Sequence, residues 1–291
     1  MFWAVLCAVA AAGANAAATV LQRQASLRIP AAEAFTTRFV DRLLHSPTWL
    51  ISIPVICAAA VLQALALMWG PMSLVQPILV LELPLTLVIA HLCTTTAMPR
   101  GGWWASTLTA AGLALALTCA APREGSNSLS TLDWAVAMTA TLLAIALCTA
   151  AALGCPRGKL RAALLATASA IAYGLTALLM KAAMTELSDR GAAALATAWQ
   201  TYMCVASGGL ALLLLAHAMQ AGPLTASQPA VTLGEAGASL ALGITFTADR
   251  IRTGWWLLPT TASALLTAYG ILLLARLPVL ATRTTTESDD E

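Results

Sequence analysis

Two glutamates, Glu82 and Glu235, are the acidic residues that lie well inside long apolar stretches of this sequence. A carboxylate inside a membrane is costly, and such residues usually mark a functional site. A buried carboxyl group can carry a proton or neutralise a bound cation, and both roles suit ion-coupled transport. The alternative is that each glutamate pairs with a polar neighbour and holds helices together. We expect Glu82 and Glu235 to bind or couple a transported species.

Further polar residues occupy similar apolar surroundings. Gln76 and Gln228 each directly precede a proline, Pro77 or Pro229, which removes a backbone donor and predicts a helix break. Such breaks often line substrate sites, although a simple packing kink explains a proline equally well. The two glutamines could ligate a cation, bind a polar substrate or join two helices. Asn15 and Tyr173 are two other candidates for lining a central path. The alternative is a purely structural role, since one hydrogen bond would satisfy each side chain.

The sequence contains no recognisable enzyme or metal motif. Its seven cysteines and three histidines lack metal-ligand spacing, and no phosphate-binding loop or nucleophile elbow occurs. We therefore predict no catalytic residue and no cofactor, and we assign no metal site. An ion would enter only as the transported species, Mg²⁺, or as a coupling ion, H⁺, and not as a resident cofactor.

The composition places these residues in a membrane. Of 291 residues, 59% are hydrophobic and 10% charged, which excludes a water-soluble globule. The net charge is +2 and the basic residues do not cluster, which excludes nucleic acid as a partner. The expected partners are the lipid bilayer, a small solute or cation, and a second copy of the chain in a homodimer. Strand-type alternation is absent, so we predict an all-α, polytopic protein with about nine transmembrane helices. These helices are expected near 2–22, 47–69, 72–92, 103–120, 133–154, 161–184, 195–217, 224–245 and 255–278.

The distribution of basic residues predicts the orientation. One side of the membrane would hold ten Lys and Arg residues and the other five. Because basic residues are retained on the cytoplasmic side, the N-terminus should lie outside and the C-terminus in the cytoplasm. The membrane is expected to be the plasma membrane. The first apolar stretch could instead be a secretory signal with a cleavage site near 14–16. Residues 23–46 have the pattern of an interfacial amphipathic helix, and the acidic tail 281–291 is expected to be disordered.

The chain also repeats itself at a constant shift of 152 residues. Gln76-Pro77 matches Gln228-Pro229, and Gly102-Trp103-Trp104 matches Gly254-Trp255-Trp256. Because five crossings separate the two copies, the second must be inverted, as in many secondary transporters. The predicted organisation is a first repeat over 1–132, a connecting transmembrane helix over 133–156, a second, inverted repeat over 157–280 and the tail 281–291. Glu82 and Glu235 miss equivalence by one residue, about 100° of helix rotation.

These residues resemble the drug/metabolite transporter (DMT) superfamily, and within it the EamA-like and NIPA-like magnesium transporter branch. The family motif, Asn-x(7)-Pro-x-x-Leu-Val-x-Pro-Leu, is matched by Pro71, Leu74, Val75 and Pro77, with Gln63 in place of the asparagine. The family's preceding Gly-Glu falls near positions 59–60, where both residues are alanine. The resemblance implies a multi-pass carrier of two interlocked inverted halves, and it adds Gln63 to the candidate site.

The resulting expectation is a secondary transporter that moves a small solute, either an organic metabolite or a divalent cation such as Mg²⁺, by alternating access. The alternative is a non-transporting multi-pass protein, either an assembly partner or a membrane enzyme whose site has no recognisable motif.

Overall fold

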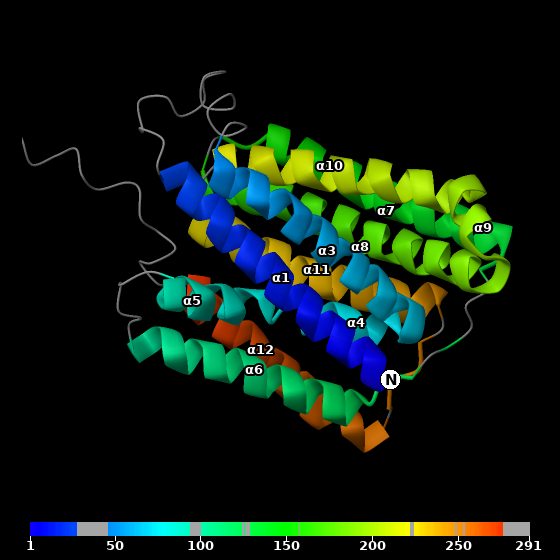
Figure 1. The fold of residues 1–291 in the computed structure, drawn as a ribbon, viewed down its shortest axis with the longest axis horizontal. Helices are drawn as coiled ribbons and strands as arrows, with labels where there is room; N and C mark the ends of the chain where they lie inside the picture. Colours follow the sequence, from blue (N-terminus) through cyan, green and yellow to red (C-terminus); the bar gives the residue numbers. More distant parts are fainter. Residues whose placement is uncertain are drawn as a thin grey trace, which may run out of the picture.

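The structure is built almost entirely of helices, as the apolar runs predict. The computed structural model describes residues 1–27, 46–93, 100–123, 125, 129–156, 158–221, 224–247, 249–252 and 254–275. In chain order (Figure 1) the elements are α1 (Phe2–Leu27), α3 (Pro47–Trp69), α4 (Met72–Leu79), α5 (Glu82–Cys93), α6 (Arg100–Ala120), α7 (Thr131–Leu153), α8 (Lys159–Arg190), α9 (Ala192–Thr197), α10 (Trp199–Ala221), α11 (Leu224–Phe246), the 3-10 turn η2 (Gly254–Trp256) and α12 (Leu257–Ala275).

Within the described ranges, eight helical segments are long and apolar enough to cross a membrane. The protein is therefore a multi-pass, all-helical membrane protein. Seven of the segments correspond to α1, α3, α6, α7, α8, α10 and η2–α12, and the eighth joins α4 to α5. The predicted ninth span is α11, which has 23 residues but a shorter apolar part, Ala230–Phe246.

The predicted helix over 72–92 is interrupted in its middle. The turn between α4 and α5 is tight, because Val80 N–H donates to the Pro77 carbonyl at 3.1 Å and Leu81 N–H to the Ile78 carbonyl at 3.0 Å. Pro84 explains the interruption, since it has no N–H to donate to the Val80 carbonyl four residues earlier and its ring would clash there.

Two other predicted elements differ from the structure or lie outside it. The helix expected over 195–217 is divided, because Ala198 is extended and separates α9 from α10. Helix α1 continues to Leu27, but the remainder of the predicted interfacial helix, residues 28–45, lies outside the described residues, as does the tail 281–291.

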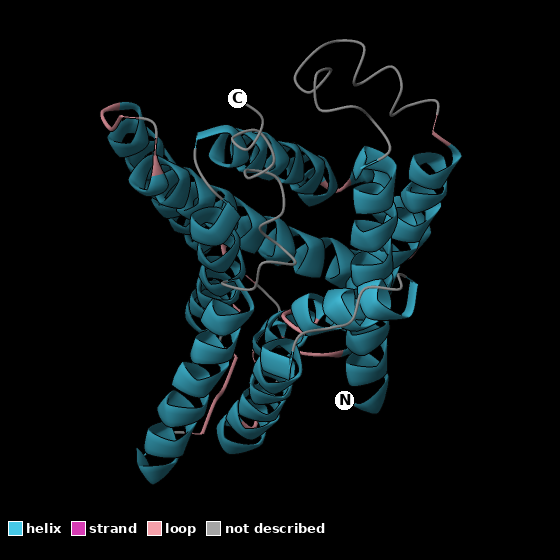
Figure 2. Ribbon diagram, turned by 90° about the vertical axis from the view of Figure 1, so that its left-hand side faces the viewer, coloured by secondary structure: helices cyan, strands magenta, loops and turns pink. Residues whose placement is uncertain are grey.

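The helices pack in recurring pairs. Helix α1 lies along α3 and also contacts α4 and α5, α8 contacts α10 and α11, and α6 pairs with α12. Figure 1 shows α1 beside α3 and α6 beside α12, and Figure 2 gives the same bundle turned by 90°. Small residues allow these approaches: a Cβ on Gly70 would lie 2.6 Å from the Ala4 Cβ, and one on Gly112 would lie 2.8 Å from the Thr267 nitrogen. Packing of this kind is usual between membrane helices.

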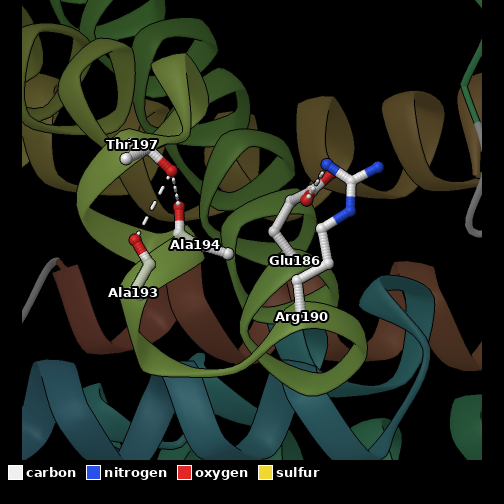
Figure 3. A network of polar contacts seen from close by, with 5 residues as sticks. All are labelled: Glu186, Arg190, Ala193, Ala194 and Thr197. Atoms are coloured by element: carbon white, nitrogen blue, oxygen red, sulfur yellow. Dashed lines mark hydrogen bonds and ion pairs between the residues drawn. The ribbon is translucent and has the colours of Figure 1, made fainter.

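Local capping interactions fix several helix ends. At the start of α7, the Ser130 hydroxyl oxygen accepts from Asp133 N–H at 3.2 Å and the Asp133 carboxylate accepts from Ser130 N–H at 3.0 Å. At the far end of α8, Arg190 pairs with Glu186 at 3.0 Å, and Gly191, with φ of 82°, turns the chain into the short α9 (Figure 3). The Glu186–Arg190 pair is partly solvent-exposed, so it contributes little to stability.

Candidate functional site

Three polar side chains from three helices interact at one place in the bundle: Glu82 of α5, Glu235 of α11 and Tyr173 of α8. All three are half-buried. Glu235 interacts electrostatically with Glu82, and Tyr173 interacts with both carboxyl groups. The structure thus brings together three of the residues predicted from sequence, including the two glutamates whose positions in the repeat differ by one residue. We refer to Glu82, Glu235 and Tyr173 as the acidic cluster.

The interruption between α4 and α5 positions Glu82. This glutamate is the first residue of α5, directly after the Val80–Leu81 turn. Its carbonyl oxygen accepts from the Thr86 hydroxyl at 2.7 Å, and its Oε1 accepts from the hydroxyl of Thr19 on α1 at 3.3 Å. A carboxylate at a helix start is also favoured by the helix dipole.

The other side of the acidic cluster depends on a close approach of α8 and α11. A Cβ on Gly174 would lie 2.9 Å from the Ala238 Cβ, and one on Gly234 would lie 2.8 Å from the Ala170 Cβ. Gly174 directly follows Tyr173 in the chain, and Gly234 directly precedes Glu235. The contact therefore holds the backbones that carry Tyr173 and Glu235 close to each other.

The remaining predicted site residues are more dispersed. Asn15 lies one helical turn before Thr19 on α1, and therefore on the same face. Gln63 is half-buried on α3. Gln76 on α4 is 2% exposed, and neither its amide oxygen nor its nitrogen has a hydrogen-bond partner in the described part of the chain. The Gln228 side chain lies outside what the structure describes.

The two prolines predicted as helix breaks lie inside continuous helices. Pro77 is within α4, and the backbone of α11 is helical through Pro229. The breaks that the structure has in this region are at Gly70–Pro71, between α3 and α4, and at Val80–Leu81. Removal of one backbone donor at Pro77 or Pro229 is thus absorbed without ending the helix.

The Gly70–Pro71 break brings in a basic residue that the sequence analysis did not assign to the site. Lys181 of α8 is 3% exposed, and its Nζ donates to the carbonyl oxygens of Leu67 at 2.8 Å and Gly70 at 3.0 Å. The last carbonyls of a helix lack intrahelical partners and form its negative end, where a cation is favourable. The available signal was a lysine inside an apolar run, which is itself uncommon.

Asp249, a buried acid, was also missed. It is 4% exposed and lies in the short link between α11 and η2, and the sequence analysis gave it no role. Its Oδ2 accepts from the backbone N–H of Ser73 on α4 at 2.9 Å, although the two residues are 176 positions apart. No local pattern predicts a contact of that range.

The acidic cluster has a defined chemical capacity. Two carboxylates that interact electrostatically repel each other when both are ionised, so a shared proton or a bound cation between them is favourable. The Tyr173 hydroxyl can donate to a carboxylate or to a bound solute. Among the described residues, the acidic cluster included, no group of three or more His, Cys, Asp and Glu side chains is arranged to hold a metal ion. The acidic cluster is suited to a proton or to a loosely held cation rather than to a closed metal centre.

Comparison with known proteins gives one relative of similar length. The chain is 27% identical over 257 residues to an uncharacterized protein of Corynebacterium glutamicum, and the match covers 87% of each chain. No protein-family profile matches the chain, and no solved structure matches it. The resemblance to the drug/metabolite transporter superfamily therefore stays a prediction.

Proposed function

We propose that this protein is a secondary transporter that moves a small solute across the plasma membrane by alternating access. The observation that carries the proposal is the acidic cluster: two acidic side chains from the two predicted repeats, Glu82 and Glu235, interact inside a helical membrane protein. A pair of this kind can exchange a proton for a cation, or bind a divalent cation that keeps several of its waters. The transported solute is accordingly an organic metabolite or a divalent cation such as Mg²⁺.

The helix packing supports the inverted repeat on which alternating access depends. In the predicted first repeat α1 contacts α3 and the α4–α5 segment, and in the second α8 contacts α10 and α11. The α6–α12 pair then joins the equivalent last helices of the two repeats. Carriers built this way rock one copy against the other around a site near the middle of the membrane. The predicted orientation, with the N-terminus outside and the C-terminus in the cytoplasm, belongs to the same proposal.

The experiment is solute flux into proteoliposomes that contain the purified protein. An entrapped Mg²⁺ indicator reports divalent cation entry, and an entrapped pH dye reports proton movement when a panel of small organic solutes is added outside. We expect protein-dependent flux that falls at least tenfold in Glu82→Gln and in Glu235→Gln. Glu186→Gln is the matched control, because Glu186 lies in the partly exposed ion pair at the end of α8 (Figure 3) and is not part of the acidic cluster.

Each result has a distinct meaning. Flux of Mg²⁺ that needs both glutamates identifies a cation carrier, and proton movement that needs an organic solute identifies a metabolite carrier. Folded protein that gives neither signal, or flux that is unchanged in both glutamate variants, contradicts the proposal. That outcome would favour the alternative of a non-transporting membrane protein.

A further inference from the structure

The link between α11 and η2 crosses to the first half of the chain at one end of the bundle. Its Asp249 side chain accepts from the N–H of Ser73, the second residue of α4, at 2.9 Å. The Gly70–Pro71 break lies just before α4, and Gly70 packs against Ala4 near the start of the chain. The contact is therefore at the end of the bundle that carries the N-terminus.

Asp249 provides a cap that the local sequence of α4 lacks. The first N–H groups of a helix have no intrahelical partner, and the dipole makes that end favourable for a negative charge. The residue at the cap position of α4 is Pro71, which makes no side-chain cap hydrogen bond. The carboxylate that fills this role comes instead from the second half of the protein.

Gly243 on α11 makes room for this carboxylate. A Cβ at Gly243 would lie in a tight contact, 3.3 Å, with Asp249 Oδ2 and in ordinary contact, 3.6 Å, with the Met72 Cβ, so a larger residue would press on the carboxylate. The Gly243 carbonyl oxygen also accepts from Asp249 N–H at 3.1 Å and from the Thr247 hydroxyl at 2.6 Å. The position of Asp249 is thus determined from its backbone as well as from its side chain.

The same link is also bound to the loop after α6. Arg250 and Arg123 form an isolated antiparallel bridge, with N–H to carbonyl distances of 3.0 Å and 2.9 Å. Arg252 N–H donates to the Ala120 carbonyl at 2.8 Å. Together with Asp249, these bonds join three elements that are distant in sequence: the start of α4, the α6–α7 loop and the α11–η2 link.

From these contacts we infer that Asp249 is a positioning residue of the transport cycle, a latch that keeps the N-terminal end of the bundle closed by holding α4 against the α11–η2 link. The inference rests on the proposed function. The latch is a single charge-assisted hydrogen bond, because Asp249 Oδ1 has no partner in the described part of the chain. It can therefore break and re-form without unfolding either helix, as a gate must when the two halves rock.

Local opening of α4 is the direct test, and it needs no substrate. Hydrogen–deuterium exchange of the peptide covering residues 72–79 is measured in nanodiscs for the wild type, Asp249→Ala and Asp249→Asn. We expect exchange at least tenfold faster in Asp249→Ala and within about threefold of wild type in Asp249→Asn, because an asparagine oxygen can still accept from Ser73 N–H. Asp189→Ala, at an exposed position near the end of α8, is the matched control and should leave exchange unchanged.

A native thiol gives an independent reading. Cys7 is 9% exposed and packs in one apolar cluster with Met72, Leu74 and Val75 of α4. Its modification by a maleimide should be at least fivefold faster in Asp249→Ala than in the wild type, with peptides of the α8–α11 contact unchanged. Unchanged exchange of α4 and unchanged Cys7 labelling in folded Asp249→Ala would overturn the inference. Faster exchange throughout the protein would assign Asp249 a general structural role and overturn it as well.

Two further variants keep the test decisive. If Asp249→Ala does not fold, Gly243→Ala replaces it, because the added methyl group crowds Asp249 Oδ2 and shifts it relative to Ser73 N–H, and it should speed α4 exchange severalfold. Where a transported solute is known, Asp249→Ala should lower the maximal flux while the half-saturating concentration stays within twofold, since the acidic cluster is untouched. The exchange and labelling results stand even if Glu82→Gln and Glu235→Gln leave flux unchanged, so failure of the latch and failure of the transporter are distinguishable.

Discussion

The Lys181 ammonium nitrogen lies 3.0 Å from the carbonyl oxygen of Gly70, so that a positive charge from α8 occupies the end of α3 at the helix break. On the other side of the break, the carboxylate of Asp249 occupies the start of α4. The break thus has a cation at its negative helix end and an anion at its positive helix end, each from a different element. An interrupted helix in a membrane requires this kind of compensation, because no water is available to satisfy the freed backbone groups.

Replacing Lys181 by methionine should destabilise the protein. Lys181→Met keeps the aliphatic volume but leaves the Leu67 and Gly70 carbonyls without the ammonium donor, at an expected cost of about 2–3 kcal/mol. The measurement is the midpoint of thermal unfolding of the purified protein in detergent. Lys181→Arg retains the charge and should lose less. A Lys181→Met protein as stable as the wild type would show that the ammonium group does not stabilise the break.

Sequence reasoning selected Glu82 and Glu235 as candidates because the signal at each residue was local. A single charged residue within about 20 apolar ones is conspicuous, and Glu82 and Glu235 stand out on that basis alone. That the two carboxyl groups interact is a property of the helix packing, in particular of the α8–α11 contact at Gly174 and Gly234. The one-residue mismatch in the repeat therefore did not keep them apart.

Other features could not be predicted from local patterns. Asp249 resembles any loop acid until the fold places Ser73 beside it. The α4–α5 interruption depends on Pro84. The sequence analysis predicted a break at Pro77 instead, because a Gln-Pro pair occurs in both copies of the repeat. The length of an apolar run identifies a membrane helix but does not indicate where that helix is interrupted. Residues 72–92 were therefore predicted to form one helix.

A methyl group at Gly234 should loosen the α8–α11 contact. The new Cβ of Gly234→Ala would lie 2.8 Å from the Ala170 Cβ, too close for two carbons, so the helices must separate or shift at a cost of about 1–3 kcal/mol. Gly237→Ala is the matched control on the same helix, because a Cβ there meets nothing within 4 Å. The comparison is the thermal midpoint of the two variants. Equal midpoints would mean that the approach at Gly234 is not as close as the structure has it.

Gln76 distinguishes a ligand-binding role from a packing role. The side chain is buried with both amide atoms unpartnered in the described part of the chain, so Gln76→Leu removes a desolvation cost and should leave stability unchanged or raise it by about 1–2 kcal/mol. If the amide binds the transported solute, flux in proteoliposomes should fall at the same time. A more stable protein with full flux would remove Gln76 from the site, and a less stable one would show that the amide has a structural partner.

Restoring a backbone donor at Pro84 should affect the acidic cluster without touching a polar side chain. In Pro84→Ala the new N–H can donate to the Val80 carbonyl, which in the wild type accepts from Leu83 N–H at 3.2 Å. The α4–α5 turn would then tend toward continuous helix, with Glu82 rotated away from Thr19 and Glu235. We expect slower hydrogen exchange over residues 78–85 together with a severalfold lower flux. Pro77→Ala is the control, since helix α4 already continues through Pro77. Full flux in Pro84→Ala despite slower exchange would mean that Glu82 acts without the turn that places it.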